Sequence, residues 1–79
     1  MMIFKAFIEK DQKGVFALYS IVHYESTGEV DGQYYMNGTW HTDSAVAEMY
    51  MKNDPNLIEI SSSQLRYHMD RLKWMDRAK

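Results

Sequence analysis

The sequence predicts an α+β fold in one small domain that spans residues 1–79. β-branched and aromatic residues dominate the first half of the chain, and this composition is typical of strands. The second half carries apolar residues at helical spacing, interrupted by one short β-prone run. A chain of 79 residues has the length of one domain rather than two. The predicted architecture is a three-stranded antiparallel meander, then a helix, a short strand and a C-terminal helix, with both helices on one sheet face.

The meander begins with two long β-prone runs. Residues 2–9 and 15–24 are rich in Ile, Val, Phe and Tyr, and the turn residues 11–14 lie between them. We therefore expect the two runs to pair as an antiparallel hairpin. Gly28 permits a positive φ in the turn that follows the second run.

Residues 29–40 supply the third strand, with Gly32 as a bulge or bend inside it. An alternative interpretation divides this segment. Asn37 and Gly38 are the residues that a two-residue type I′ hairpin prefers, so they can join two shorter strands instead.

The first helix follows the meander. Thr42, Asp43 or Ser44 can cap its N-terminus, because short polar side chains accept a hydrogen bond from the first free N–H groups. Asn53 can take the left-handed conformation at its end, and Pro55 blocks continuation.

The last helix has the most specific start signal in the chain. Residues 57–60 form a short strand, and Ser61 follows as the N-cap. Gln64 then lies three residues after the cap, which completes a capping box. Ile60 and Leu65 occupy the two positions of a hydrophobic staple.

The apolar pattern of these elements also predicts which side chains form the core. The predicted core residues are Phe4, Ile8, Phe16, Leu18, Val22, Val46, Met49, Ile58, Ile60, Leu65, Met69 and Leu72.

The last helix carries a second group of large side chains outside its apolar stripe. Leu65 and Leu72 mark the stripe, and Tyr67, Arg71 and Trp74 fall nearly opposite it at about 100° per residue. Trp, Tyr and Arg dominate the energetic centres of protein interfaces. We predict that these three residues bind a partner. The alternative is structural: Trp74 folds back over a sheet edge, or Arg71 stacks on it locally.

Charge is distributed unevenly along the chain, whose net charge is −2. Residues 1–62 hold four Lys and Arg against nine Asp and Glu, whereas residues 63–79 hold five against two. Within the acidic part, Glu25, Glu29 and Asp31 surround one turn, which predicts a secondary contact for a basic protein surface. An ordinary solvated turn is the alternative.

The sequence contains no pattern that predicts an enzyme, a metal site or a cofactor. There is no cysteine, and His23, His41 and His68 lack the spacing of metal ligands. His41, Asp43 and Ser44 are the residue types of a hydrolase triad, but near-neighbours at a helix start point apart, so capping is the better interpretation. We therefore predict no catalytic residue, no metal and no cofactor.

Composition predicts a protein partner. Eleven aromatic residues and seven Met are a heavy load for a domain of this size, and both types are enriched at interfaces. A homodimer is the main alternative. Nucleic-acid binding through the basic last helix is less well supported, because the pI of about 5.8 and the acidic body repel phosphate. We expect no membrane span and no signal peptide, and hence a cytoplasmic protein.

The chain is small and acidic and lacks cysteine, and its predicted strands lead to Thr42-Asp43-Ser44, a helix and the strand LIEI. In these respects it resembles small phage-encoded proteins. These proteins bind and disable host machinery, as polymerase inhibitors and counter-defence proteins do. The resemblance implies a non-enzymatic inhibitor or regulator that binds a larger host or defence protein stoichiometrically.

Overall fold

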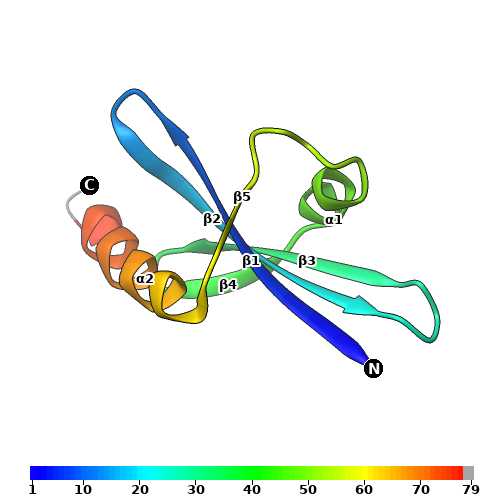
Figure 1. Ribbon diagram of the computed structural model, residues 1–79. Coiled ribbons are helices and arrows are strands. Elements are labelled where there is room, and N and C mark those ends of the chain that lie inside the picture. Colours follow the sequence, from blue (N-terminus) through cyan, green and yellow to red (C-terminus); the bar gives the residue numbers. More distant parts are fainter. Residues whose placement is uncertain (78–79) are drawn as a thin grey trace.

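The computed structural model describes the backbone of residues 1–77, and the side chains of these residues except Phe16 and 73–77. In chain order, its elements are β1 (Met2–Asp11), β2 (Gly14–Tyr24), β3 (Val30–Met36), β4 (Thr39–Thr42), α1 (Ser44–Met51), β5 (Ile58–Ile60) and α2 (Ser62–Arg77). The strands form one antiparallel sheet in the order β4-β3-β2-β1-β5 (Figure 1). The predicted α+β fold, a meander followed by helix, short strand and helix, is confirmed.

The meander has four strands because the segment 29–40 is divided at its Asn-Gly turn. Asn37 and Gly38 both have positive φ, 53° and 78°, which is the backbone of a type I′ turn. Met36 pairs with Thr39 across this turn, so β3 and β4 form a tight hairpin. The alternative interpretation of this segment is therefore the correct one.

The two helices lie on opposite faces of the sheet, so the prediction of one shared face is wrong (Figure 1). Helix α1 packs Val46 against Phe7 and Ile21, which are buried on one face. Successive residues of a strand point to opposite faces, so the residues next to Phe7 and Ile21 in the chain point to the other face of the sheet. If both helices packed on one face, the apolar side chains on the other face of the sheet would be exposed to water.

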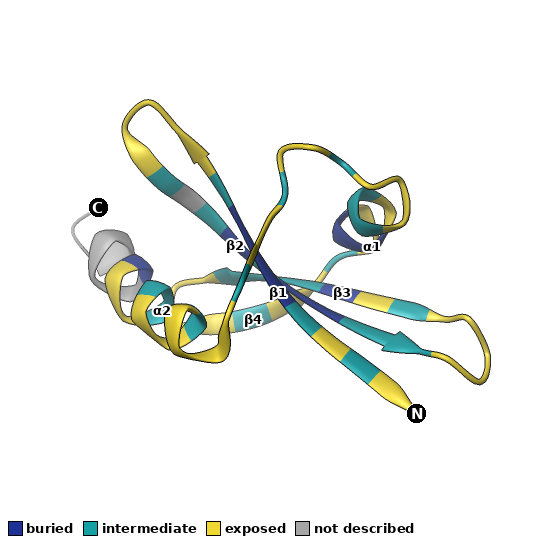
Figure 2. Cartoon of the chain, viewed as in Figure 1, coloured by how far each residue is buried: buried dark blue, intermediate teal, exposed yellow. Residues whose placement is uncertain are grey.

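Helix α2 covers the second face. Its Leu72 packs with Ile8 and Leu18, and Leu18 is completely buried. Because β1 carries Phe7 and Ile8 at consecutive positions, it contributes to both clusters at once. The buried residues accordingly lie at the middle of the strands, between the helices (Figure 2).

Gly32 allows α1 to approach β3 closely. The register between β2 and β3 passes through Gly32 without a shift, so the predicted bulge is absent and Gly32 pairs with Ile21. A Cβ at this position would lie 2.5 Å from the backbone nitrogen of Ala47 and 2.9 Å from Cβ of Val46. Only glycine fits there without moving the helix, which is why this position lacks a side chain.

Two predicted core residues are exposed. Phe4 is 58% exposed and Ile58 is 39% exposed, because no helix covers the half of the sheet face where Phe4 lies and β5 is an edge strand. Phe7 and Ile21, which the prediction omitted, are buried instead. The predicted core position Phe16 lies outside the described side chains.

Both helix starts follow the sequence signals. Asp43 is the cap of α1: its Oδ1 accepts from the Ala45 N–H at 2.9 Å. At α2, the Gln64 N–H donates to Ser61 Oγ at 3.3 Å and the Ser61 N–H donates to Gln64 Oε1 at 2.9 Å. The predicted capping box at Ser61 is confirmed. Among the described residues, no helix is long and apolar enough to cross a membrane.

Candidate functional site

The predicted anchor Tyr67 lies on the solvent side of α2. It is 56% exposed, while Leu65, Met69 and Leu72 on the other side of the helix pack against the sheet. Arg71, one turn later, donates from Nη1 to the Tyr67 hydroxyl oxygen at 3.2 Å. Its guanidinium carbon lies 5.6 Å from the centroid of the Tyr67 ring, within the range of a cation–π contact. These two contacts favour one orientation of the exposed ring.

His68 is a further neighbour of Tyr67 on α2. The Tyr67 ring meets His68 edge-on, with 5.2 Å between the ring centroids. Burial and the neighbouring positive charge of Arg71 lower the pKa of His68 below its usual value. Trp74 belongs to α2, but its side chain lies outside the described residues, so its predicted role stays a prediction.

The predicted acidic contact lies at the other end of the sheet. Glu25, Glu29 and Asp31 are all exposed around the turn between β2 and β3. This turn and α2 are at opposite ends of the molecule (Figure 1). The structure therefore does not bring the two predicted contacts together into one surface, and each would have to bind on its own.

The polar residues that resemble an enzyme site are used structurally. Asp43 caps α1, as expected, and the His41 ring stacks on Tyr34 with 5.2 Å between centroids. His23 lies 3.3 Å from the Tyr50 hydroxyl, measured from Nδ1. Among the described residues, no three His, Asp or Glu side chains come together to hold a metal ion.

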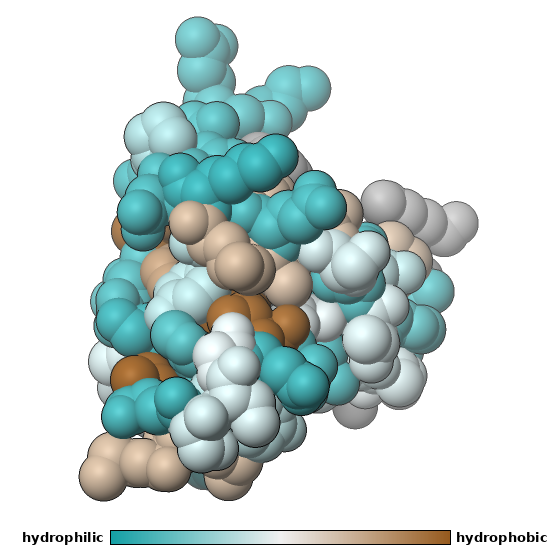
Figure 3. Space-filling model, turned by 90° about the vertical axis from the view of Figure 1, so that its right-hand side faces the viewer, coloured by the Kyte–Doolittle hydropathy of each residue, from teal (hydrophilic) through white to brown (hydrophobic). Residues whose placement is uncertain are grey.

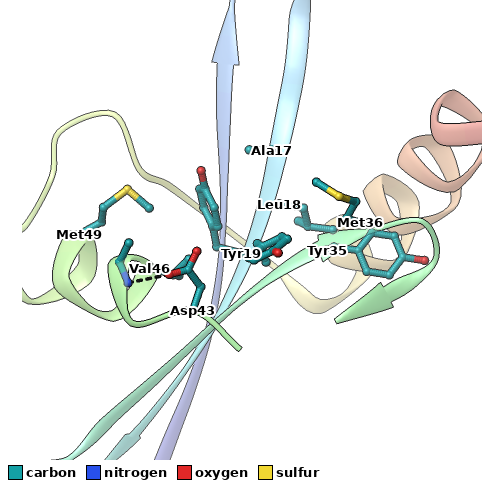
Figure 4. A pocket seen from close by; sticks show the side chains of 10 residues that line it. Ala17, Leu18, Tyr19, Tyr35, Met36, Asp43, Val46 and Met49 are labelled. Atoms are coloured by element: carbon teal, nitrogen blue, oxygen red, sulfur yellow. Dashed lines mark hydrogen bonds between the residues drawn. The ribbon is translucent and has the colours of Figure 1, made fainter. Parts of the chain in front are cut away.

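A pocket of about 420 Å³ lies between α1, β2 and β3. The pairing of β2 with β3 begins at Tyr19 and Tyr34, and beyond this pair the two strands separate. Helix α1 closes the resulting wedge from the side. The lining residues are Ala17, Leu18, Tyr19, Tyr34, Tyr35, Met36, Asp43, Ala45, Val46 and Met49. In Figure 4, Tyr19 lies between Met49 and Asp43 on one side and Tyr35 and Met36 on the other.

Carboxylates lie in and beside this pocket. The Tyr19 hydroxyl donates a hydrogen bond to the Glu9 carboxylate. Burial, the Glu9 carboxylate and the charges of Asp54 and Asp43 together raise the pKa of Tyr19 well above its usual range. Tyr19 is therefore neutral at physiological pH. The pocket therefore combines a neutral phenol with nearby carboxylates.

Sequence reasoning did not find this pocket, although one signal for it exists. The second β-prone run is longer than the part of the third that precedes Asn37, and in the structure β2 has 11 residues and β3 has 7. A longer strand must extend past its neighbour and leave one edge unpaired. The apolar lining of the wedge gave no separate signal, because Tyr and Met are equally common in cores.

A third exposed feature is the N-terminal half of β1. Met1 is 89% exposed and Met2 is 66% exposed, and Phe4 points to the same sheet face as Met2. Strand β5 pairs only with Ala6–Ile8, so no described strand covers the outer edge of residues 2–5. Figure 3, which looks from the side of α1 and the N-terminal end, shows apolar patches scattered among polar residues.

Comparison with known proteins found no matching family model, no matching curated protein and no matching solved structure.

Proposed function

We propose that this protein is a non-enzymatic binding module that attaches stoichiometrically to a larger protein partner and so inhibits or regulates it. The observation that carries the proposal is the exposed Tyr67 ring, fixed by Arg71 on a helix whose opposite side is anchored in the core. An exposed aromatic side chain that is already ordered loses little conformational entropy when a partner covers it.

The location and origin in this proposal rest on sequence resemblance and composition, and no structural observation supports them. The resemblance to small phage-encoded inhibitors favours a host or defence protein as the partner. A cytoplasmic location fits the same interpretation. Trp74 and the acidic turn remain part of the proposal as predicted additional contacts.

The proposal is tested by affinity capture of the tagged protein from a bacterial lysate. We expect one protein to be retained at a one-to-one ratio, and Tyr67→Ala to weaken its binding by about 30-fold, because truncating an anchor ring removes about 2 kcal/mol. The double variant Tyr67→Ala/Trp74→Ala should bind still more weakly. Titration of the purified complex by calorimetry measures both effects.

Arg66→Ala is the matched control, because Arg66 is also an exposed arginine on α2, whereas the contacts to the Tyr67 ring come from Arg71. It should bind as the unchanged protein does. Circular dichroism must show that each variant melts as a folded protein. If Tyr67→Ala binds a captured partner undiminished, the α2 face is not the anchor.

A homodimeric protein is the second candidate, and the exposed half of β1 favours it. An open strand edge beside Met2 and Phe4 is a template for pairing with another chain. This candidate predicts a mass that doubles with concentration in sedimentation equilibrium, and Phe4→Lys should keep the protein monomeric. A monomer across a hundredfold range of concentration would exclude it.

A further inference from the structure

The pocket between α1, β2 and β3 combines an apolar wall with a negatively charged mouth. On the α1 side of the sheet, Val46 and Met49 supply aliphatic surface and Tyr34 supplies a ring. Asp43 is the carboxylate in the lining itself. Its Oδ1 accepts from Ala45, and an ionised carboxylate has about four acceptor positions, so Oδ2 is free to accept from a ligand.

The charged groups that act on Tyr19, which lines the pocket, are carboxylates. The carboxylates of Glu9 and Asp54, with that of Asp43, act on the Tyr19 hydroxyl at the centre of the wedge. A second hollow of about 440 Å³ on the same side of the sheet differs in this respect, because Lys5 and Glu59, which line it, form an ion pair at 3.4 Å. The first pocket therefore attracts cations, whereas the second is locally neutralised.

The size of the pocket fits a side chain rather than a large cofactor. About 420 Å³ lies near the lower end of the range for ligand pockets, roughly 300–1,000 Å³. Met36 and Met49 border it, and the flexible thioether of Met adapts to the shape of an inserted group. Tyrosine rings attract cations through their negative faces.

We propose that this pocket receives a cationic side chain, arginine or lysine, from a basic segment of the partner protein. The aliphatic stem lies against Val46 and Met49, and the charged end reaches the Asp43 carboxylate beside the tyrosine rings. The acidic body of the chain, residues 1–62, draws such a segment toward the pocket at long range. This proposal rests on the proposed protein-binding function and adds the chemistry that the partner must present.

The test uses purified protein and two small probes that differ only in charge. N-acetyl-arginine amide carries the cation, and N-acetyl-citrulline amide is its neutral isostere. Titration of each into ¹⁵N-labelled protein is followed by amide chemical shifts. We expect arginine amide to shift the amides of Ala45, Val46, Tyr19 and Tyr34 in a saturable way, and citrulline amide to bind at least about fivefold more weakly.

Two variants test separately whether binding depends on the negative charge of the pocket and on its free volume. Asp43→Asn keeps the capping oxygen, because Asn caps helices as well as Asp does, but it removes the charge. We expect it to weaken arginine amide about fivefold or more. Ala45→Phe fills the wedge from an exposed position of α1 and should abolish binding. Asp70→Asn makes the same chemical change on α2, on the other sheet face, and should leave binding unchanged.

Absence of localised shifts with arginine amide overturns the proposal, and so does equal binding of the two probes. Equal weakening by Asp43→Asn and Asp70→Asn also overturns it, because the effect would then be one of net charge. These measurements need no partner protein, so they give a result even if the capture experiment on Tyr67 fails. Conversely, if arginine amide does not bind to the pocket, this proposal is overturned even when a partner is captured through Tyr67.

Discussion

The Tyr19 hydroxyl shows how one residue joins the fold to the pocket. Its ring packs beside the α1 cluster, and its hydroxyl donates to Glu9 on the neighbouring strand. Burial, and after it the Glu9 carboxylate, make ionisation of the phenol unfavourable, so the pKa of Tyr19 is raised. A free tyrosine in the unfolded chain loses its proton at about pH 10. Above about pH 10, the folded state therefore keeps a proton that the unfolded state releases.

This difference predicts a loss of stability in base. Below pH 10 both states are protonated at Tyr19 and the stabilisation is fully present, whereas above it the unfolded state gains by ionising and stability falls with pH. The free energy of unfolding of Tyr19→Phe should fall less steeply above about pH 10. Urea titrations at a series of pH values measure this, with Tyr67→Phe as a surface control. Parallel curves for the unchanged protein and Tyr19→Phe would contradict the prediction.

At the scale of single elements, α2 depends on its cap. Ser61 and Gln64 satisfy each other's backbone N–H groups, and Ile60 and Leu65 pack in the same cluster just beside them. These contacts fix the direction in which the helix leaves β5. The exposed Tyr67 is presented by this first part of α2, so the cap also positions the proposed anchor.

Replacing Ser61 should therefore affect both stability and binding. We expect Ser61→Ala to lower the free energy of unfolding by about 1 kcal/mol, because one helix N–H loses its acceptor. Amide exchange should accelerate in the first turn of α2. Ser62→Ala, at the next position, is the control and should change little. If the two variants have equal urea midpoints, the capping box does not stabilise the helix.

The elements were predictable because their signals are local. The capping box at Ser61 needs four residues, and the Asn37-Gly38 turn needs two, so the sequence alone contains each signal. The choice of sheet face is not local. Phe7 and Ile8 are both apolar, and only the packing of α1 and α2 decides which helix covers which residue.

The candidate site was predictable to the same extent. The exposure of Tyr67 followed from helical spacing, which is a property of one element. The pocket required three elements to meet, with Asp43 from the α1 cap opposite Tyr19 and Tyr34 from two strands. The spacing of residues in the sequence does not show that these three elements come together. Phe4 was wrongly predicted to be buried for the same reason, since its exposure depends on where the helices pack.

Over the whole molecule, two small clusters share one pair of strands. Ile21 belongs to the α1 cluster and Leu18 to the α2 cluster, yet both lie on β2. A domain of this size has little stability to divide between independent parts. We infer that the two faces unfold together rather than one after the other.

A mild core substitution tests this cooperativity. Ile21→Val should lower the free energy of unfolding by about 1 kcal/mol and speed amide exchange in α2 as well as α1, although Ile21 faces only α1. Ile58→Val is the matched control, because Ile58 is partly exposed. Faster exchange confined to α1 would show that the faces are independent units.

We expect β5 to pair with β1 only after the strands of the meander have paired with one another. The meander strands join neighbours in the chain, but the Lys5–Glu59 contact beside the β1–β5 ladder spans 54 positions. Closing so long a loop is slow compared with forming hairpins. A nascent chain therefore passes through a stage in which Ala6–Ile8 joins Met2 and Phe4 as one uncovered apolar edge. Aggregation during synthesis through the edge of Ala6–Ile8 is the hazard that this late strand removes.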